Sequence, residues 1–337
     1  MKTKYLGRTG LRVSEVCLGT MTFGNQSDEA TSFAIMDAAI EGGIDFFDNA
    51  DVYPLGGGPG LVGETEAIMG RWFAARGKRE DVVLATKCFG QMGPRPNDSG
   101  LGRKHVIKAC EDSLRRLQTD YIDLYQTHGP DAHVPIEETM RALDDLVRAG
   151  KVRYVGASNY AAWQLSDAIW TSRLNGLASY VSLQPRYNLL FRMIEDELLP
   201  VCKAHGLGVI SYNPLAGGML TGRYANDRAL QAGSRFTLEH GRGDMYRRRY
   251  WSDAVHDEVD RLAAVASRHG HSLTHLALQW VLSQPLITSA IVGASRPDQL
   301  RDSLGAVGLT LSDEERAACD EAWFNLPREK DPEIARR

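Results

Sequence analysis

Long apolar runs and an excess of basic residues are both missing from this sequence of 337 residues. No stretch approaches the ~18 consecutive apolar residues that a membrane helix needs, and the first residues contain no apolar signal segment. We therefore expect a cytoplasmic protein without a membrane partner. Lysine and arginine number 39 against 43 acidic residues, a net charge of −4. Nucleic acid is not an expected partner, because nucleic-acid-binding faces are basic.

Cysteine is scarce, and its pattern excludes a disulfide framework. The five cysteines are odd in number, scattered and never in a CxxC pair, which indicates buried free thiols in a reducing compartment. They are Cys17, Cys88, Cys110, Cys202 and Cys319. The HGHSLTH stretch holds His269, His271 and His275, but no carboxylate or thiolate nearby completes a metal site. We expect no bound metal there, and a new helix capped by Ser272 instead.

Short apolar runs alternate with amphipathic stretches along most of the chain. The runs are residues 16–18, 45–47, 82–85, 122–126, 152–156, 180–184, 208–212 and 289–292. Helical spacing of apolar residues separates them, as in 34–39 and 136–147. Such alternation predicts parallel strands joined by helices. Eight units close most simply into a (β/α)₈ TIM barrel, with an open doubly wound sheet as the alternative, and we expect one domain over residues 1–337.

Glycine-rich and polar segments punctuate this pattern. Residues 5–13 predict an N-terminal β-hairpin about a glycine-containing turn. The GGGPG stretch after Tyr53 is not GxGxxG, so it predicts a loop rather than a Rossmann phosphate site. Three connections, 53–63, 88–102 and 215–250, are unusually long and follow expected strands. They should meet at the C-terminal rim of the barrel and form the walls of a site.

The end of the longest connection holds the MYRRRYW cluster. A solvated charge run is the ordinary interpretation of such a segment, and binding of an anionic substrate is the alternative. Tyr250 and Trp251 are candidates for the pocket wall, because they follow this connection.

Four chemically reactive residues lie at or just beyond the ends of expected strands: Asp48, Tyr53, Lys87 and His128. A tyrosine donates a proton poorly at neutral pH unless its phenolate is stabilised, and a nearby ammonium lowers the phenol pKa. We therefore assign Tyr53 as proton donor to a carbonyl and Lys87 as its electrostatic partner. Asp48 would anchor the lysine, and His128 would orient the carbonyl oxygen. Taken singly, each has a structural alternative, such as a strand-end cap for Asp48 or a hydrogen-bonded core histidine for His128.

With these residues in place, the chain resembles the aldo-keto reductase family. The matching stretches, in order, are GxxxxDNADVY (43–53), ATK (85–87), DLYQTHGPD (123–131), GASN (156–159), SLQPRYN (182–188), NPLAGGMLTGRY (213–224) and IVGASRPDQL (291–300). They cover nearly the whole chain. LGTMTFG near the start and LTGRY late are similar to long bacterial members related to potassium-channel beta subunits.

The resemblance implies a nicotinamide dinucleotide extended across the barrel rim. Position by position, it implies contacts from Gly19, Thr20, Met21, Asp48, Ser158, Asn159, Gln184, Tyr212, Pro214, Leu215, Gly217, Leu220, Arg223, Arg235, Gly293, Ser295, Arg296, Gln299, Asp302 and Ser303. NADPH is expected over NADH, because Arg296 or Arg235 can pair with a 2′-phosphate. Relatives often carry Glu-Asn where this chain has Asp302-Ser303, which is expected to weaken contacts to the adenine amine.

The expected function is NADPH-dependent reduction of a small aldehyde or ketone to an alcohol. A dinucleotide-binding, redox-sensing regulatory protein is the alternative, and a barrel enzyme with a Lys87 Schiff base is a third hypothesis. Neither the physiological carbonyl compound nor an oligomeric state is indicated by the sequence.

Overall fold

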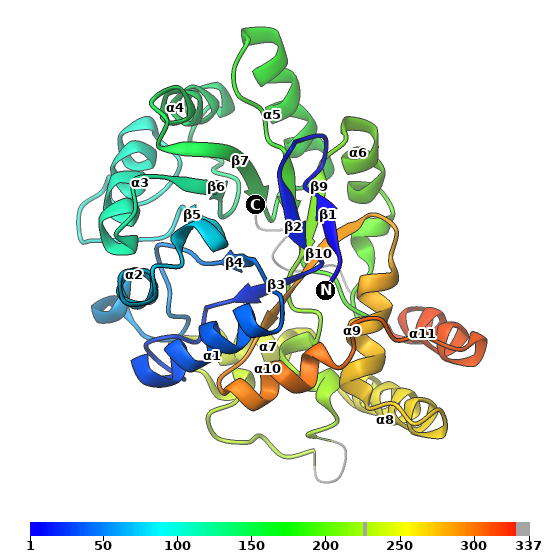
Figure 1. Cartoon of the computed structure of the whole chain (residues 1–337). Helices are drawn as coiled ribbons and strands as arrows, with labels where there is room; N and C mark the ends of the chain where they lie inside the picture. Colours follow the sequence, from blue (N-terminus) through cyan, green and yellow to red (C-terminus); the bar gives the residue numbers. More distant parts are fainter. Residues whose placement is uncertain (225–227, 328–337) are drawn as a thin grey trace.

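The computed structural model describes residues 1–224 and 228–327. Its parallel strands form a closed barrel in the order β10-β3-β4-β5-β6-β7-β8-β9 (Figure 1). They are β3 (Val16–Gly19), β4 (Phe46–Asp48), β5 (Val83–Cys88), β6 (Ile122–Thr127), β7 (Val152–Ser158), β8 (Ser182–Gln184), β9 (Gly208–Ser211) and β10 (Ile287–Gly293). Each of the eight predicted runs overlaps one of these strands. The predicted barrel is therefore confirmed, and the open sheet is excluded.

Helices surround the barrel. One helix follows each of β3 to β8: α1 (Glu29–Glu41), α2 (Glu64–Arg76), α3 (Arg103–Leu117), α4 (Ile136–Arg148), α5 (Ala162–Asn175) and α6 (Leu198–His205). Between β9 and β10 lie α7 (Arg242–Tyr250), α8 (Asp253–Arg268) and α9 (Leu273–Ser283), and after β10 come α10 (Pro297–Leu304) and α11 (Asp313–Asn325). The short 3-10 helices are η1 (Pro59–Leu61), η2 (Arg79–Asp81), η3 (Met193–Glu195), η4 (Ala216–Thr221) and η5 (Arg235–Thr237). The long connection predicted at 215–250 is thus partly helical.

Local signals in the sequence set the ends of several helices. Helix α8 ends at Arg268, and the Ser272 hydroxyl accepts a hydrogen bond from the backbone N–H of His275 at 3.1 Å. Ser272 is therefore the N-cap of α9, as predicted. At the end of α2, Gly77 takes a left-handed conformation with φ of 60°.

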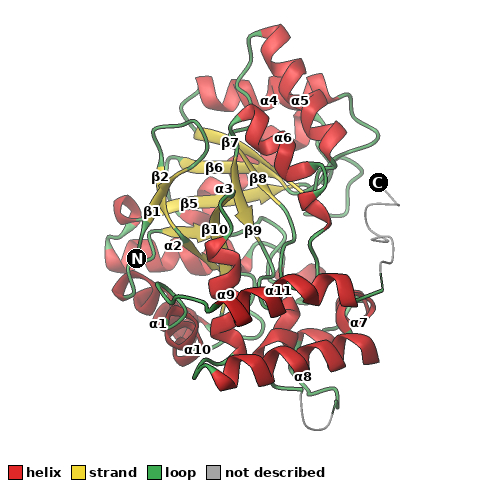
Figure 2. Cartoon of the chain, turned by 90° about the vertical axis from the view of Figure 1, so that its right-hand side faces the viewer, coloured by secondary structure: helices red, strands yellow, loops and turns green. Residues whose placement is uncertain are grey.

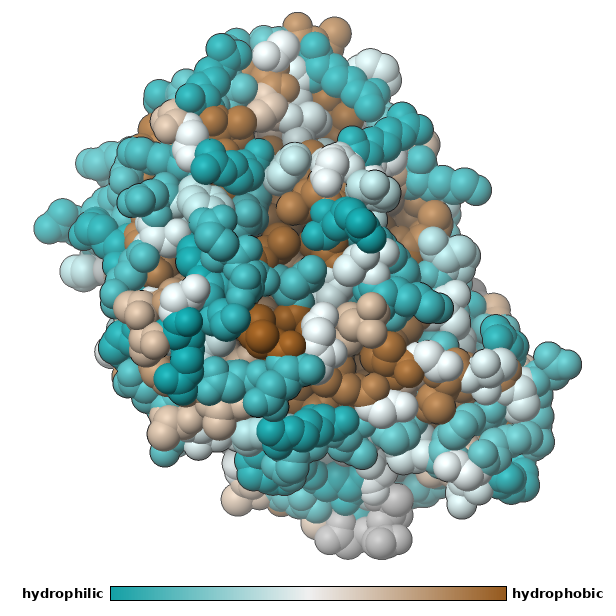
Figure 3. Space-filling model, viewed as in Figure 1, coloured by the Kyte–Doolittle hydropathy of each residue, from teal (hydrophilic) through white to brown (hydrophobic). Residues whose placement is uncertain are grey.

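The N-terminal hairpin closes one end of the barrel. Strands β1 (Thr3–Tyr5) and β2 (Arg12–Ser14) pair antiparallel, as predicted. The adjoining Leu6 and Val13 are fully buried in a cluster with interior barrel residues. Figure 2 shows the hairpin and helix α7 at opposite ends of the barrel. Hydrophilic residues cover most of the hairpin-bearing face of the molecule (Figure 3).

Side chains along each strand point alternately into and out of the barrel, and the inward ones form an apolar layer and a polar layer. On β4, Phe46 joins the interior cluster, whereas Phe47 points outward and packs on Trp72 at a ring distance of 5.8 Å. Asp48 therefore returns to the interior one layer above Phe46. The same alternation places Lys87 above Ala85 on β5, with Ala85 in the interior cluster. The reactive carboxylate and ammonium thus share the layer nearest the C-terminal rim.

The described residues contain no helix that is both long and apolar enough to cross a membrane. All five cysteines are buried free thiols, as predicted.

Candidate active site

A cavity of about 1080 Å³ opens at the carboxyl ends of the strands. All three predicted long connections contribute to its wall, through Leu55, Phe89 and Arg235 among others. The prediction that these connections enclose a site is therefore confirmed. The cavity lies at the end of the barrel opposite the hairpin, where parallel-barrel enzymes carry their active sites.

The centre of the polar layer is a buried ion pair. The ammonium of Lys87 donates to Asp48 Oδ2 at 2.6 Å and to the backbone carbonyl of Asn49 at 2.7 Å. The Lys87 side chain is 0% exposed and that of Asp48 is 4% exposed. The other carboxylate oxygen, Asp48 Oδ1, accepts from Gln184 Nε2 at 2.7 Å and Gln126 Nε2 at 3.1 Å. The ion pair is therefore held in one orientation by neutral amides.

Tyr53 and His128 lie against this pair and both line the cavity. Their rings meet edge to face, with centroids 5.7 Å apart and an interplanar angle of 80°. The Lys87 ammonium is 5.2 Å from the centre of the Tyr53 ring. The backbone N–H of His128 is bonded to the carbonyl of Cys88 at 3.0 Å, which ties the end of β6 to the end of β5. The structure thus brings together all four residues proposed for catalysis.

The electrostatics of Tyr53 differ from the sequence expectation in one respect. Burial raises the pKa of Tyr53, and the charge and hydrogen bond of Lys87 lower it by less, so that the net pKa lies above its ordinary value. The prediction that Lys87 lowers the pKa of Tyr53 is confirmed, but burial raises this pKa by more. Burial by itself lowers the pKa of Lys87, and Asp48 and Tyr53 more than restore it, so that the lysine pKa is raised. At neutral pH the phenol therefore holds its proton and the lysine its charge.

A hydrogen-bonded group on the neighbouring strand ends forms the next part of the cavity wall. Asn159 Nδ2 donates to the carbonyl of His128 at 2.8 Å, and Tyr212 Oη donates to Asn159 Oδ1 at 2.8 Å. Ser158 Oγ donates to the carbonyl of Gln184 at 2.9 Å. Both N–H groups of the Gln184 amide are engaged, one with Asp48 Oδ1 and one with Gln126 Oε1. The side chain of Gln184 can therefore offer only its amide oxygen, as an acceptor, to the carboxamide group of a ligand.

The remaining residues implied to bind a dinucleotide extend from this group across the rim. Those that line the cavity are Gly19, Thr20, Met21, Pro214, Leu215, Gly217, Arg223, Arg235, Gly293, Ser295, Arg296, Gln299, Asp302 and Ser303. Leu220 is the exception: its side chain is fully buried, and it does not line the cavity. Its place in η4 turns it into the core, where Met219 is buried as well.

The two arginines considered for a 2′-phosphate differ in their surroundings. Arg296 is paired with both carboxylate oxygens of Asp298 at 3.2 Å, and its side chain is 60% exposed. Arg235 lies 3.6 Å from the sulfur of Met21 and 3.4 Å from the hydroxyl of Tyr246. Arg235 therefore reaches into the cavity without a carboxylate partner in the described part of the chain.

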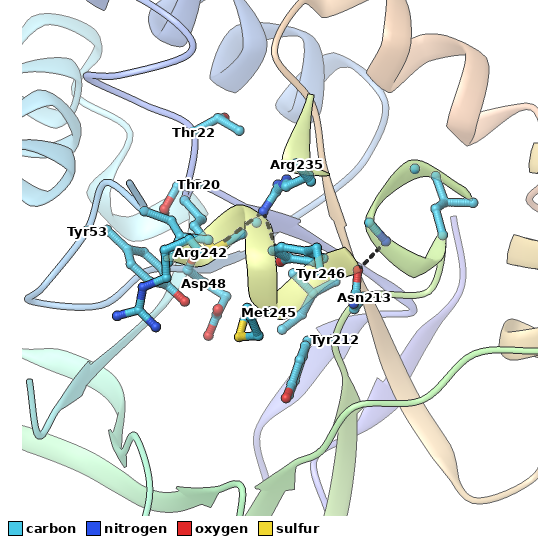
Figure 4. A pocket seen from close by; sticks show the side chains of 18 of the residues that line it. Thr20, Thr22, Asp48, Tyr53, Tyr212, Asn213, Arg235, Arg242, Met245 and Tyr246 are labelled. Atoms are coloured by element: carbon cyan, nitrogen blue, oxygen red, sulfur yellow. Dashed lines mark hydrogen bonds between the residues drawn. The ribbon is translucent and has the colours of Figure 1, made fainter. Parts of the chain in front are cut away.

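The last part of the predicted 215–250 wall is helix α7, whose helical form the sequence does not predict. Arg242, Met245 and Tyr246 line the cavity (Figure 4), and Arg249 lines it as well. Their spacing of i, i+3, i+4 and i+7 places them on one face of the helix. This spacing is the signal that would have identified them once a helix was assigned to 242–250.

The prediction that Tyr250 and Trp251 line the pocket is wrong, because both turn away from the cavity-facing side of α7. The Tyr250 hydroxyl accepts from Asn188 Nδ2 at 3.0 Å, and the ring is 1% exposed. Trp251 packs on Phe236 at a ring distance of 4.8 Å.

The protein is thus a closed (β/α)₈ barrel with a cavity at the carboxyl ends of its strands. The model of the Aldo/keto reductase family matches residues 15–323, so the chain belongs to this family. Membership makes the protein an oxidoreductase of carbonyl compounds, with a nicotinamide cofactor as the family generally uses.

Three relatives show how widely the family is spread. The chain is 41% identical over 320 residues to the "Uncharacterized oxidoreductase YrpG" of Bacillus subtilis, with 93% of each chain covered. It is 39% identical to a "Probable voltage-gated potassium channel subunit beta" of Oryza sativa subsp. japonica, with 91% of each covered. It is 34% identical to a "Putative aryl-alcohol dehydrogenase" of Schizosaccharomyces pombe, with 96% of this chain and 95% of the relative covered.

Proposed function

We propose that the protein reduces an aldehyde or ketone to an alcohol with NADPH, and that Tyr53 donates the proton. The observation that carries this proposal is the contact of a cavity-lining phenol with a buried ammonium, which is itself paired with Asp48 at 2.6 Å. A carboxylate, an ammonium and a phenol in this order form a proton donor whose conjugate base is stabilised before the reaction begins.

The cavity residues fit a dinucleotide in size and in chemistry. The volume of about 1080 Å³ lies at the upper end of small-molecule sites, which suits a cofactor together with a substrate. Asn159 and Asn213 line the cavity and are held at positive φ, at 61° and 64°. Such strain in non-glycine residues gathers at ligand sites. Bound NADPH would supply the hydride, and Tyr212 with the Asn159 amide would face its nicotinamide end.

Each of the four central side chains has a separate task in this proposal. Tyr53 Oη gives its proton to the carbonyl oxygen, and the positive charge of Lys87 stabilises the phenolate that remains. Asp48 keeps Lys87 charged and fixed inside the barrel. His128, across from the Tyr53 ring, orients the carbonyl oxygen by a hydrogen bond.

We assign NADPH rather than NADH as the cofactor because Arg235 and Arg296 line the cavity. A guanidinium pairs bidentately with a phosphate oxyanion. Arg235 is the stronger candidate, since Arg296 already pairs with Asp298. Buried free thiols suit a reducing compartment, so we also place the protein in the cytoplasm.

The direct test follows NADPH absorbance with the purified protein and a panel of aldehydes, ketones and quinones, with product analysis for the alcohol. NADPH consumption matched by alcohol formation is the expected result. Tight NADPH binding without turnover on any carbonyl would favour the redox-sensing regulatory alternative. A lysine adduct trapped by borohydride in the presence of substrate would favour Schiff-base chemistry at Lys87.

A further inference from the structure

Helix α7 carries a cation at each end of its cavity-facing stripe. Arg242 and Arg249 lie seven residues apart, about 10 Å along the helix axis, with Met245 and Tyr246 between them. The other two arginines of this helix, Arg247 and Arg248, do not line the cavity. Arg247 donates to Asp244 and to the carbonyl of Phe236, and Arg248 is exposed and does not line the cavity.

Arg242 is placed at a cost to local stability. It is the first residue of α7, where a positive charge opposes the helix dipole. It makes no ion pair and no side-chain hydrogen bond with residues of the described ranges 1–224 and 228–327. Arg242 is exposed and lines the cavity, so its guanidinium is available to an anionic ligand there.

Arg242 lies toward the reacting end of the cavity. Figure 4 shows its guanidinium on the Tyr53 side, whereas Arg235 extends in another direction toward Tyr246. The residues just before Arg242 pack on the loop that follows Tyr53. A Cβ added to Gly58 would lie 2.9 Å from His240 Nε2, and one added to Gly56 would lie 3.3 Å from Leu238 Cδ2. This packing holds the start of α7 next to the Tyr53 loop.

Apolar side chains line the same cavity as this cation and the proposed proton donor. Val52 and Leu55 flank Tyr53, Phe89 comes from the end of β5, and Met245 from α7. A ligand reaching from Tyr53 to Arg242 therefore needs an apolar body between two polar ends. One guanidinium matches one carboxylate in bidentate geometry.

We propose that the preferred substrate is an aldehyde or ketone that carries a carboxylate, and that Arg242 is the specificity residue that binds it. The inference rests on the proposed function, because it concerns the substrate of the same reaction. Arg249 adds positive charge at the other end of the stripe, and Arg242 makes the direct pair with the carboxylate.

The test uses a series of ω-oxo-alkanoic acids of increasing chain length, 4-carboxybenzaldehyde, and the methyl ester of each. The series varies the distance between carbonyl and carboxylate, and each ester removes the charge while keeping the carbon skeleton. We expect kcat/KM to favour the acid over its ester at one or more lengths. In Arg242→Gln, kcat/KM for that acid should fall about 10- to 100-fold through KM, as for loss of a charged hydrogen bond, with about twofold change or less for the ester.

Three comparisons make the test specific. Arg242→Lys keeps the charge without the bidentate fork and should recover part of the acid preference. Arg248→Gln, on the same helix but outside the cavity, should leave both kcat/KM values unchanged. The Kd for NADPH, measured by fluorescence quenching, should be unchanged in Arg242→Gln.

Four outcomes would overturn the inference. Equal kcat/KM for acid and ester at every length would contradict a carboxylate site. Equal losses on acid and ester in Arg242→Gln would mean a structural role, and a weakened NADPH complex would assign Arg242 to the nucleotide. These three leave the proposed function standing. Absence of reduction of both acids and esters by the unaltered protein would instead refute the proposed function, and the inference with it.

Discussion

Replacing Lys87 by methionine removes one partner of a buried ion pair and leaves the other behind. At a separation of 2.6 Å and an effective dielectric constant of about 20, the attraction between Lys87 and Asp48 amounts to about 6 kcal/mol. Desolvation of two charges in the barrel opposes most of this attraction, so the pair as a whole adds little to stability. A single charge left buried has no such compensation. We expect Lys87→Met to lower the free energy of unfolding by about 3–5 kcal/mol.

The double variant Lys87→Met/Asp48→Asn tests this reasoning. An asparagine oxygen can still accept the hydrogen bonds from Gln126 and Gln184, and no charge remains. The double variant should therefore be more stable than Lys87→Met alone, although it carries one more substitution. Urea unfolding at pH 7, followed by tryptophan fluorescence, measures both differences.

A surface pair provides the matched control for this measurement. Arg141 and Glu137 pair on α4 with side chains 50% and 52% exposed, so Arg141→Met should cost less than about 1 kcal/mol. If Lys87→Met cost no more than Arg141→Met, or if the double variant were less stable than Lys87→Met, the ion pair would not have the buried character described above.

Three further predictions concern the cofactor, the proton donor and the acid stability of the fold. Arg235→Ala and Arg296→Ala should each raise the Kd for NADPH more than that for NADH, and equal losses in a fluorescence titration would put the phosphate elsewhere. Because the pKa of Tyr53 is raised, mainly by burial, its phenol stays protonated over the neutral range. The kcat/KM for reduction should therefore not fall until the pH exceeds about 10, the ordinary value for tyrosine, and a profile that falls near pH 8 would contradict this assignment. Burial alone would raise the pKa of Glu315, but hydrogen bonds at the start of α11 and from His271 outweigh it, so the net pKa is lowered. The stability due to this carboxylate is then present above about pH 4.3 and is lost as the pH falls through the lower folded-state pKa. Glu315→Gln should accordingly lower the unfolding free energy by about 1–3 kcal/mol at pH 7 and by less near pH 4, whereas an equal loss at both pH values would point to a packing effect.

The sequence predicts the scaffold of the site better than its detailed contacts. Apolar runs at regular intervals predict the eight strands, because strands buried on both faces leave that pattern. Asp48 and Lys87 stand out at strand ends, since charged groups are rarely buried unpaired. Gln126 did not stand out, because an amide inside an apolar run looks like an ordinary strand residue. Its position two residues after Leu124 on β6 places it in the polar layer, but this is recognised only once the barrel interior is defined.

The helical form of the cavity wall at 242–250, and the residues it turns toward the cavity, could not be predicted for a different reason. A segment rich in arginine and tyrosine has no clear apolar stripe, so helical periodicity was not recognised in 242–250. Without the helix, the place of Tyr250 and Trp251 in the chain predicts wall residues. The helix instead turns Tyr250 into the core and Arg242 into the cavity. Loop contacts such as Arg235 with Tyr246 depend on tertiary packing that no local pattern encodes.

Tyr53→Phe provides the most direct test of the central claim, because it removes one hydroxyl from the contact between the phenol and Lys87 and leaves the aromatic ring in place. We expect that NADPH still quenches the intrinsic fluorescence of this variant with a similar Kd. Its single-turnover rate of carbonyl reduction should fall by about 10²- to 10⁴-fold, the usual contribution of a general acid. A variant that binds NADPH and reduces the carbonyl as fast as the unaltered protein would show that Tyr53 is not the proton donor.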